Sequence, residues 1–153
     1  MSMELYVLSD EQLPSIEAWQ QAIDAAGFSL RLSTERPFAA LRGALPVMLG
    51  DRATSFECDH WSAATLMAEM PDVAFGQGWS YALAFRWGAD FDAGAATYMA
   101  ASAYATATGG RVFDCAEGKL ISPQRAGDIA REFEQSGPLV EEAVRRAMEK
   151  RRN

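Results

Sequence analysis

Short apolar runs and one helical repeat organise the first part of the chain. Residues 3–8 and 28–32 have the apolar content and alternation that are typical of strands. Between these runs, apolar residues recur at helical spacing, at Ile16, Trp19, Ile23 and Ala26. Pro14 fits the first turn of that helix, because a backbone N–H there would have no hydrogen-bond partner within the helix. Gly27 can adopt the left-handed conformation that ends a helix. The pattern predicts that the chain opens with a β-α-β unit.

The middle of the chain predicts three strands and a helix. Residues 45–49 and 54–58 have strand character and are joined by a hairpin turn at 50–52. Residues 61–70 repeat their apolar positions at helical spacing. Few positions in residues 80–87 are polar, so we expect this strand to lie near the centre of the sheet.

A helix of small residues is predicted next, over residues 93–108. Asp92 is the expected N-cap, because its carboxylate can accept the unpaired N–H groups of the first turn, and Gly109 is the expected stop. Four alanines form one stripe along this helix, at Ala96, Ala100, Ala103 and Ala107. The stripe predicts that a strand or a second helix packs closely against it.

The C-terminal part predicts a hairpin and two helices. Two short strands are expected at residues 112–113 and 120–121, and Ser122-Pro123 has the cap-then-proline order that begins a helix. Gly137-Pro138 is expected to break this helix. Residues 137–153 then hold a last, amphipathic helix.

The order of these elements predicts the α+β class. The length suits one domain over residues 1–153, and no internal repeat, low-complexity segment or long linker divides it. We expect a mixed sheet of about six or seven strands, with four or five helices.

Charge is unevenly distributed along the chain. The net charge is −7, yet residues 145–153 carry a balance of +4. Residues 1–144 therefore hold nine basic and twenty acidic side chains, a balance of −11. Such a body repels phosphate backbones and attracts basic protein surfaces, so we expect a protein partner and no nucleic acid. The alternative to a protein partner is that the acidic side chains only keep the protein soluble.

Targeting signals are not evident in the sequence. Residues 1–13 already carry three acids, which disfavours a signal peptide, and residues 93–107 are too short and too polar for a membrane span. Cys58 and Cys115 are expected to be reduced thiols. We therefore expect a cytoplasmic protein without membrane contact.

One segment, Glu57-Cys58-Asp59-His60, crowds together residues able to do nucleophilic, acid/base or metal chemistry. Cys58 and His60 lie two apart on a predicted strand and point to the same face, so the geometry of a Cys-His pair is open. However, no glycine-rich turn or helix N-terminus precedes Cys58 to activate the thiol. We expect no catalysis, and keep a small enzyme using Cys58 and His60 as an alternative.

Patterns for cofactors and metal ions are also weak. One histidine and two cysteines are too few for a structural zinc site. Asp90-Phe91-Asp92 lacks the further oxygens of a calcium loop, and Gly76-Gln77-Gly78 does not complete a dinucleotide fingerprint. We expect no metal and no cofactor.

Large aromatic side chains gather around residues 80–87. Alternation places five large residues on one face, at Trp79, Tyr81, Leu83, Phe85 and Trp87. Arg86 points to the other face, where we expect it near the alanine-rich helix and paired with an acid. Rings on one face predict a core, and the alternative is that Trp79 or Trp87 anchors an interface at a strand end.

Three short motifs carry a resemblance to known proteins. Pro14-Ser15-Ile16-Glu17-Ala18-Trp19 opens the first helix, and Leu45-Pro46-Val47 precedes the strand end Phe56-Glu57. Thr108-Gly109-Gly110-Arg111-Val112-Phe113-Asp114 then leads through Glu117-Gly118-Lys119-Leu120 to Ser122-Pro123. This order resembles a loose set of small bacterial proteins, some of which are similar to immunity proteins of toxin–immunity pairs such as those of type VI secretion.

The resemblance implies a cytoplasmic non-enzyme that neutralises a cognate toxin by occluding its active site. No functional residue is carried over from such a set. The acids and aromatics of three segments, residues 57–61, 72–79 and 88–92, are our expected partner-binding surface. Its residues are Glu57, Asp59, His60, Trp61, Asp72, Trp79, Asp90 and Asp92. A further alternative is a structural or adaptor subunit that forms a homodimer through the final helix.

Overall fold

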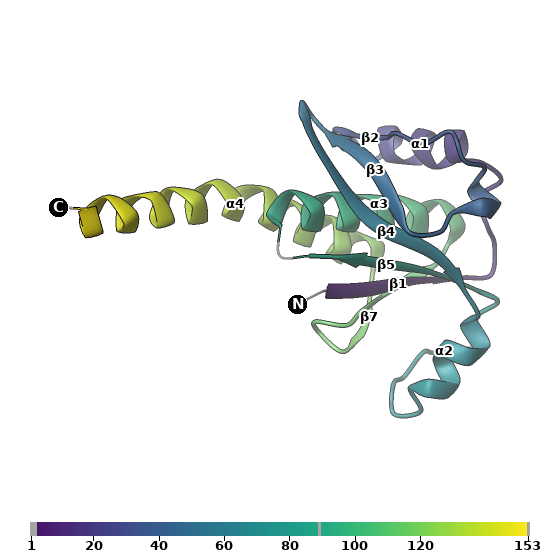
Figure 1. The fold of residues 1–153 in the computed structure, drawn as a ribbon. Coiled ribbons are helices and arrows are strands. Elements are labelled where there is room, and N and C mark those ends of the chain that lie inside the picture. The colour runs from purple at the N-terminus through teal and green to yellow at the C-terminus, as the bar shows by residue number, and fades with distance from the viewer. Residues whose placement is uncertain (1–2, 89, 153) are drawn as a thin grey trace.

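The computed structural model describes residues 3–88 and 90–152 as a seven-stranded sheet with helices on both faces (Figure 1). The strands are β1 (Met3–Ser9), β2 (Leu30–Leu32), β3 (Ala44–Leu49), β4 (Arg52–Trp61), β5 (Tyr81–Trp87), β6 (Arg111–Asp114) and β7 (Lys119–Ile121). The helices are α1 (Ile16–Ala25), the 3-10 helix η1 (Phe38–Ala40), α2 (Ala63–Glu69), α3 (Phe91–Thr108) and α4 (Pro123–Arg152). The expected α+β class is confirmed.

The sheet has the order β2-β3-β4-β5-β1-β6-β7. All strand pairs among the described residues are antiparallel, so the sheet is purely antiparallel rather than mixed. β5 is the fourth of seven strands, which confirms its expected central place. The opening order of strand, helix and strand is confirmed, but β3, β4 and β5 separate β1 from β2. The unit is therefore not a parallel crossover.

Local capping chemistry sets the ends of α1. Ser15 is the N-cap, and its hydroxyl accepts a hydrogen bond from the Ala18 N–H at 3.0 Å. Pro14 consequently lies before the cap rather than in the first turn. Gly27 follows the helix with a φ of 80°, the left-handed stop that the sequence predicts.

The alanine-rich helix α3 begins at Phe91, two residues earlier than expected. Its N-cap is Asp90, whose carboxylate accepts the Asp92 N–H at 3.0 Å, so Asp92 lies inside the first turn. Gly109 ends the helix in the left-handed conformation, as predicted. Three of the four alanines in the predicted stripe are buried and Ala107 is exposed.

The helix expected at residues 61–70 is shorter. Trp61 is the last residue of β4, and α2 begins at Ala63 after the N-cap Ser62, whose hydroxyl accepts the Thr65 N–H. The helical repeat of the sequence thus overlaps the strand by one residue, Trp61. This difference leaves Trp61 on the sheet, which matters for the site described below.

Buried side chains form two clusters, one on each face of the sheet. The larger cluster lies between the sheet and α1, α3 and the first half of α4 (Figure 1). Within it Trp19 is completely buried, and its Nε1 donates to the Ala100 carbonyl at 3.0 Å. The smaller cluster joins α2 and the loop after it to the opposite face, through Tyr6, Leu8, Ala63, Leu66, Phe75, Ala82 and Phe113.

The aromatic face predicted along β5 is divided between these clusters. Phe85 and Trp87 are buried beneath α3, whereas Tyr81 is 41% exposed. Trp79 precedes β5 and packs into the smaller cluster on the other face. Alternation fails at Trp79 because the chain is not yet in a strand there. Arg86 pairs with an acid as predicted, but on the face away from α3.

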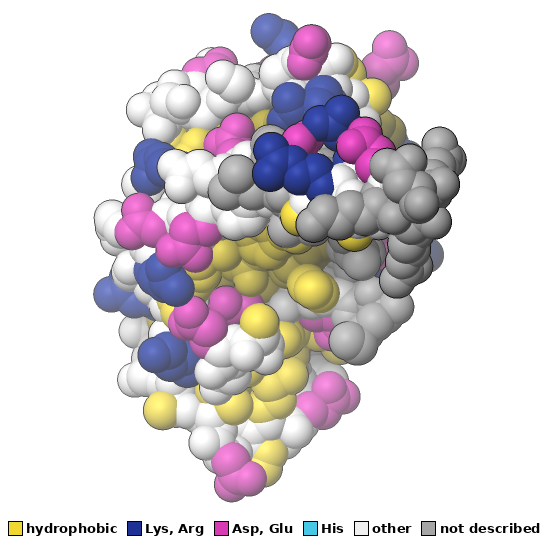
Figure 2. Space-filling view, turned by 90° about the vertical axis from the view of Figure 1, so that its left-hand side faces the viewer, with side chains coloured by type: hydrophobic (Ala, Val, Ile, Leu, Met, Phe, Trp, Pro, Cys, Tyr) yellow, Lys and Arg dark blue, Asp and Glu magenta, His cyan; other side chains and the backbone are white. Residues whose placement is uncertain are grey.

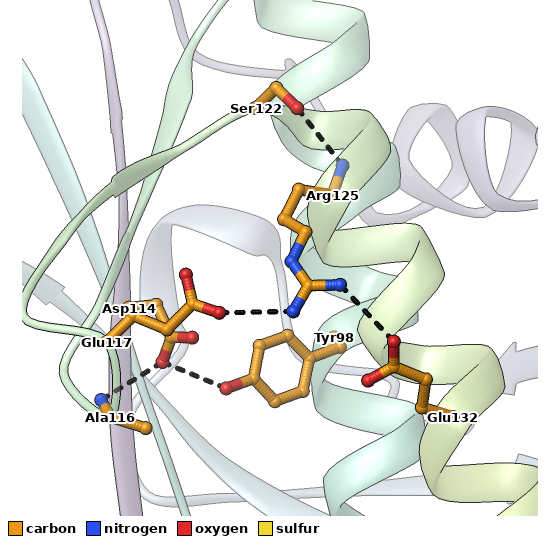
Figure 3. Close-up of polar contacts among 7 residues, drawn as sticks. All are labelled: Tyr98, Asp114, Ala116, Glu117, Ser122, Arg125 and Glu132. Atoms are coloured by element: carbon orange, nitrogen blue, oxygen red, sulfur yellow. Dashed lines mark hydrogen bonds and ion pairs between the residues drawn. The ribbon is translucent and has the colours of Figure 1, made fainter.

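A polar cluster ties the turn between β6 and β7 to α3 and α4 (Figure 3). The buried carboxylate of Asp114 accepts hydrogen bonds from the Tyr98 hydroxyl at 2.9 Å and from a backbone N–H of the turn at 3.1 Å. Burial raises the pKa of Asp114. Beside it, the Arg125 guanidinium contacts Glu117 at 3.2 Å and Glu132 at 3.3 Å.

The last helix is longer than expected. α4 runs continuously from Pro123 to Arg152, so the predicted break at Gly137-Pro138 is wrong. A proline inside a helix removes one hydrogen bond to the carbonyl four residues earlier, and the bonds of the neighbouring turns can maintain the helix. The first half of α4 packs along α3, and the second half projects beyond the rest of the fold (Figure 1).

Candidate functional site

One part of the sheet is left uncovered. Helices cover one whole face, but α2 covers only one end of the other (Figure 1). The uncovered part includes segments of β1, β4 and β5 and contains a hollow of about 310 Å³. The hollow is lined by Glu4, Tyr6, Arg42, Gly43, Glu57, Asp59, Trp61, Ala84, Phe85 and Arg86. We call this surface the open face.

Alternation along β4 explains which side chains reach the open face. Phe56 and Cys58 are buried in the larger cluster, so the residues that alternate with them along the strand point the other way. Glu57, Asp59 and Trp61 therefore share the open face. The sequence-predicted segment 57–61 is thus split between the two faces of the sheet.

Strand pairing brings a basic residue and two acids together on this face. Arg86 on β5 lies opposite both Glu4 on β1 and Glu57 on β4. Its guanidinium is 3.0 Å from Glu4 and 4.0 Å from Glu57. These side chains are between 34% and 50% exposed to water, so each ion pair contributes little to stability. The pairs fix where the charges lie.

The floor and rim of the hollow are held by hydrogen bonds. The Tyr6 hydroxyl donates to Glu4 at 3.2 Å, and burial together with the Glu4 charge raises the pKa of Tyr6 to about 12. The Asp59 carboxylate accepts the Gly43 N–H at 2.9 Å, which anchors the segment entering β3 against β4. Arg42 stands at this rim and lines the hollow.

Trp61 is the exposed aromatic of the open face. It ends β4, is 42% exposed, and packs edge-on against Tyr6 with 6.0 Å between ring centroids. An indole held on a strand by a ring beneath it loses little conformational freedom when it is covered. It is suited to be an anchor for a partner.

Asp90 and Asp92, two other predicted partner-binding residues, serve the fold at one end of the sheet. Asp92 forms an ion pair with Arg52 at 3.0 Å, and Asp90 accepts from the Thr54 hydroxyl at 3.3 Å as well as capping α3. These contacts tie the β3–β4 hairpin to the start of α3. Because the Asp90 carboxylate is the cap of α3, we assign it a structural role.

Asp72 and Trp79 lie at the opposite end. Asp72 is exposed in the loop after α2, and Trp79 is partly buried with its Nε1 donating to the Phe75 carbonyl at 2.9 Å. β5, which has 7 residues, separates this end from that of Asp90 and Asp92 by about 20 Å. The structure therefore does not bring the predicted segments into one surface.

His60 and Cys58 are on the helix-covered side of the sheet. The His60 ring packs edge-on to Phe38, and its Nε2 is 2.8 Å from the Phe38 carbonyl. Cys58 is completely buried, and burial raises its pKa well above the usual value. A buried, protonated thiol is a poor nucleophile, so this arrangement does not favour the enzyme alternative.

Seven of the ten lining residues were not among the predicted ones, and four of these have charged or hydroxyl side chains, namely Glu4, Tyr6, Arg42 and Arg86. Alternation in residues 3–8 does place Glu4 and Tyr6 on one face. What the sequence lacks is any sign that β1 and β4 flank β5. Arg86 was expected to pair with an acid, but the identity of that acid depends on strand order.

A second hollow opens at the end of the fold from which α4 projects, where apolar side chains are visible (Figure 2). It measures about 340 Å³ and is lined by Met3, Glu4, Trp87, Cys115 and Ala116. Burial raises the pKa of the Cys115 thiol to about 11. With Glu4 as the one charged group of its lining, this hollow has little means to orient a polar ligand.

Neither metal ligation nor membrane insertion is indicated where the structure is described. Among residues 3–88 and 90–152, no three His, Cys, Asp or Glu side chains group closely enough to hold a metal ion. In the same part of the chain, no helix combines the length and apolarity needed to cross a membrane.

Comparison of the chain with protein-family models, with curated proteins and with solved structures found no match.

Proposed function

We propose that this protein binds another protein through the open face and neutralises it, in the manner of a toxin inhibitor. The observation that carries the proposal is the exposure of Trp61 beside three carboxylates on an uncovered sheet face. Exposed aromatic residues at the centre of a patch are the commonest anchors of protein interfaces.

The charge of the protein indicates the chemistry of the partner. Residues 1–144 have a balance of −11, which would accelerate encounter with a basic surface. The hollow itself holds three acids and two arginines, and Arg86 is engaged with Glu4 and Glu57. A lysine or arginine of the partner would contact Asp59 and Glu57 at the edge of the hollow, next to the Trp61 ring.

Neutralisation follows from such docking if the partner is a toxin with a basic active-site cleft. Carboxylates of the open face would occupy the positions of an anionic substrate and close the cleft to it. The resemblance to immunity proteins supports this class of partner. No step of this mechanism requires chemistry by Cys58 or His60.

The experiment begins with a partner captured from cells of the source organism by the wild-type chain. The purified partner is then expressed alone and with the chain, and growth is measured. We expect growth arrest by the partner and rescue by the wild type. Association rates should fall steeply as salt rises, because the encounter is electrostatic.

Two variants locate the surface. Trp61→Ala should weaken binding by about a hundredfold, as loss of an interface anchor does. Glu57→Lys should slow association about tenfold. The matched control is Glu17→Lys, an equal charge reversal on α1, which covers the other face. Equal binding by all three variants, or a partner whose activity persists when saturated with the chain, would refute the proposal.

A further inference from the structure

A third hollow adjoins the open face, beside the loop between β2 and β3. It measures about 540 Å³ and is lined by loop residues 36 and 39–42 together with Asp59 and His60. Arg42 and Asp59 also line the hollow of the open face, so the two hollows meet at this rim. We call the third one the arginine hollow, after Arg36 and Arg42. A partner that docks on the open face would cover its entrance.

Hydrogen bonds and burial fix this loop on the sheet. The Asp59 carboxylate accepts the Gly43 N–H at 2.9 Å. The His60 Nε2 lies 2.8 Å from the Phe38 carbonyl and donates to it, because a carbonyl oxygen can only accept. Phe38 and Leu41 are buried in the larger cluster. A loop held in this way loses little conformational freedom when a partner covers it.

The two arginines of the loop keep their full charge. Arg36 donates from Nη1 to the Arg42 carbonyl at 2.8 Å. Because this acceptor is neutral, the bond orients the guanidinium but leaves its charge and its remaining N–H groups for another acceptor. Within the part of the chain that the structure describes, neither Arg36 nor Arg42 forms an ion pair. Four other arginines of the acidic body do, namely Arg52, Arg86, Arg125 and Arg131.

The chemistry of the hollow favours one class of ligand group. Two guanidinium groups that line one hollow repel each other, and an anion between them would relieve that repulsion. Their planar forks match the oxygens of a carboxylate or a phosphate. The Asp59 carboxylate lines the same hollow and repels a doubly charged phosphate more strongly than a singly charged carboxylate. A carboxylate is therefore the group that fits best.

We propose that the arginine hollow binds an aspartate or glutamate side chain of the protein partner. The inference rests on the proposed function, because it needs a partner docked on the open face. A basic residue of that partner would contact Glu57 and Asp59, and an acidic residue would contact Arg42 and Arg36 beyond the rim. The partner surface thus carries a basic and an acidic group side by side.

The hollow supplies a selectivity that acidity alone lacks. The balance of −11 in residues 1–144 attracts any strongly basic surface. A partner without the matching carboxylate would cover Arg36 and Arg42 and leave both charges unpaired, which is unfavourable. Basic proteins in general are rejected in this way, and the cognate partner is retained.

Arg42→Glu in the full chain tests the proposal, because two explanations predict opposite signs. If net charge alone governed binding, this more acidic variant would bind a basic partner faster and more tightly. We expect instead that its dissociation constant rises about tenfold or more, since the partner carboxylate now meets a like charge. Arg42→Lys keeps the positive charge and should recover most of the affinity. Arg42 is preferred to Arg36 for this test, because the Arg36 guanidinium also holds the loop.

The matched control is Arg111→Glu, an equal charge reversal at an exposed position of β6. Its dissociation constant should stay within about threefold of wild type, because the position lies outside both hollows. Circular dichroism checks that each variant is folded. Surface acids of the partner are then reversed to lysine one at a time. At least one reversal should weaken binding to wild type and restore binding to Arg42→Glu.

The outcomes separate this inference from the proposed function. If Trp61→Ala weakens binding but Arg42→Glu binds as well as wild type or better, the arginine hollow is refuted and the open face stands. If no partner acid restores binding to Arg42→Glu, the inference fails as well. A chain in which neither Trp61→Ala nor Arg42→Glu alters binding, or one that captures no partner, would refute both proposals.

A free carboxylate is the other possible source of the same group, and calorimetry of the isolated chain with succinate distinguishes it. Exposed arginines hold a single small carboxylate weakly, so we expect no saturation below about millimolar concentrations. Saturation at micromolar succinate that Arg42→Glu abolishes would identify a small-molecule site. That result would overturn the assignment of the hollow to a partner side chain.

Discussion

The two faces of this sheet share strands but differ in what covers them. Beneath α1, α3 and the first half of α4, Trp19 is completely buried and its indole N–H is bonded. On the other face, Trp61 is 42% exposed, and its ring packs edge-on against that of Tyr6. Because the larger buried cluster lies on the helix-covered face, we expect that face to contribute most of the stability. The proposed binding residues therefore lie on the face that we expect to contribute less to stability.

The largest effect is expected from Trp19→Ala. This change removes an indole that packs edge-on against three rings, those of Phe38, Phe85 and Tyr104, and leaves a cavity. The free energy of unfolding should fall by about 3–5 kcal/mol. Urea denaturation followed by circular dichroism measures the loss. A loss under about 1 kcal/mol would contradict the assignment of stability to this face.

A smaller loss is expected from Leu66→Ala on α2. Leu66 is 1% exposed, but it belongs to the smaller cluster, whose surroundings can collapse around the removed atoms. We expect a loss of about 2 kcal/mol in the same urea experiment. Ala64→Gly, at an exposed position of the same helix, is a control for helix propensity alone. A loss as large as that of Trp19→Ala would remove the contrast between the faces.

Asp114→Asn probes the buried carboxyl on the covered face. Because burial raises the pKa of Asp114 in the folded state, the folded protein binds this proton more tightly than the unfolded chain. The wild type should therefore gain stability relative to the variant as pH falls from 7 through the folded pKa. At pH 7 the two should differ by no more than about 1 kcal/mol. Parallel stability–pH curves would argue against a raised pKa.

The smallest effect on stability is expected from Trp61→Ala. Its exposed ring does not fill space in the core, so the free energy of unfolding should change by no more than about 0.5 kcal/mol. The same variant is expected to lose partner binding, which makes it the sharpest contrast with Trp19→Ala. Thermal denaturation beside a binding measurement checks both. A large loss of stability would place Trp61 in the core instead.

Local sequence signals predicted much of the fold because their causes are local. Gly27 and Gly109 adopt positive φ where the pattern requires a stop, and Ser122 accepts the Arg125 N–H at 3.1 Å where a helix is expected to begin. The local signals gave a wrong element where pairing with a distant strand competed with the local helical pattern. Trp61 matches a helical repeat but pairs with Ala82 as part of β4.

The candidate site was only partly predictable. Glu57, Asp59 and Trp61 were selected from their chemistry, and the structure places all three on the open face. Asp90 and Asp92 have the same chemistry but serve a helix cap and an ion pair at another end of the sheet. Residue type alone does not distinguish these roles.

The sequence by itself determined most of the elements, their order along the chain and the acidity of residues 1–144. Only the tertiary structure decided that Glu4 and Arg86, 82 residues apart, share a face with Glu57. It also decided that α4 continues through Gly137-Pro138. Periodicity and capping depend on neighbours within a few residues, whereas strand order depends on the total burial achieved by all strands together.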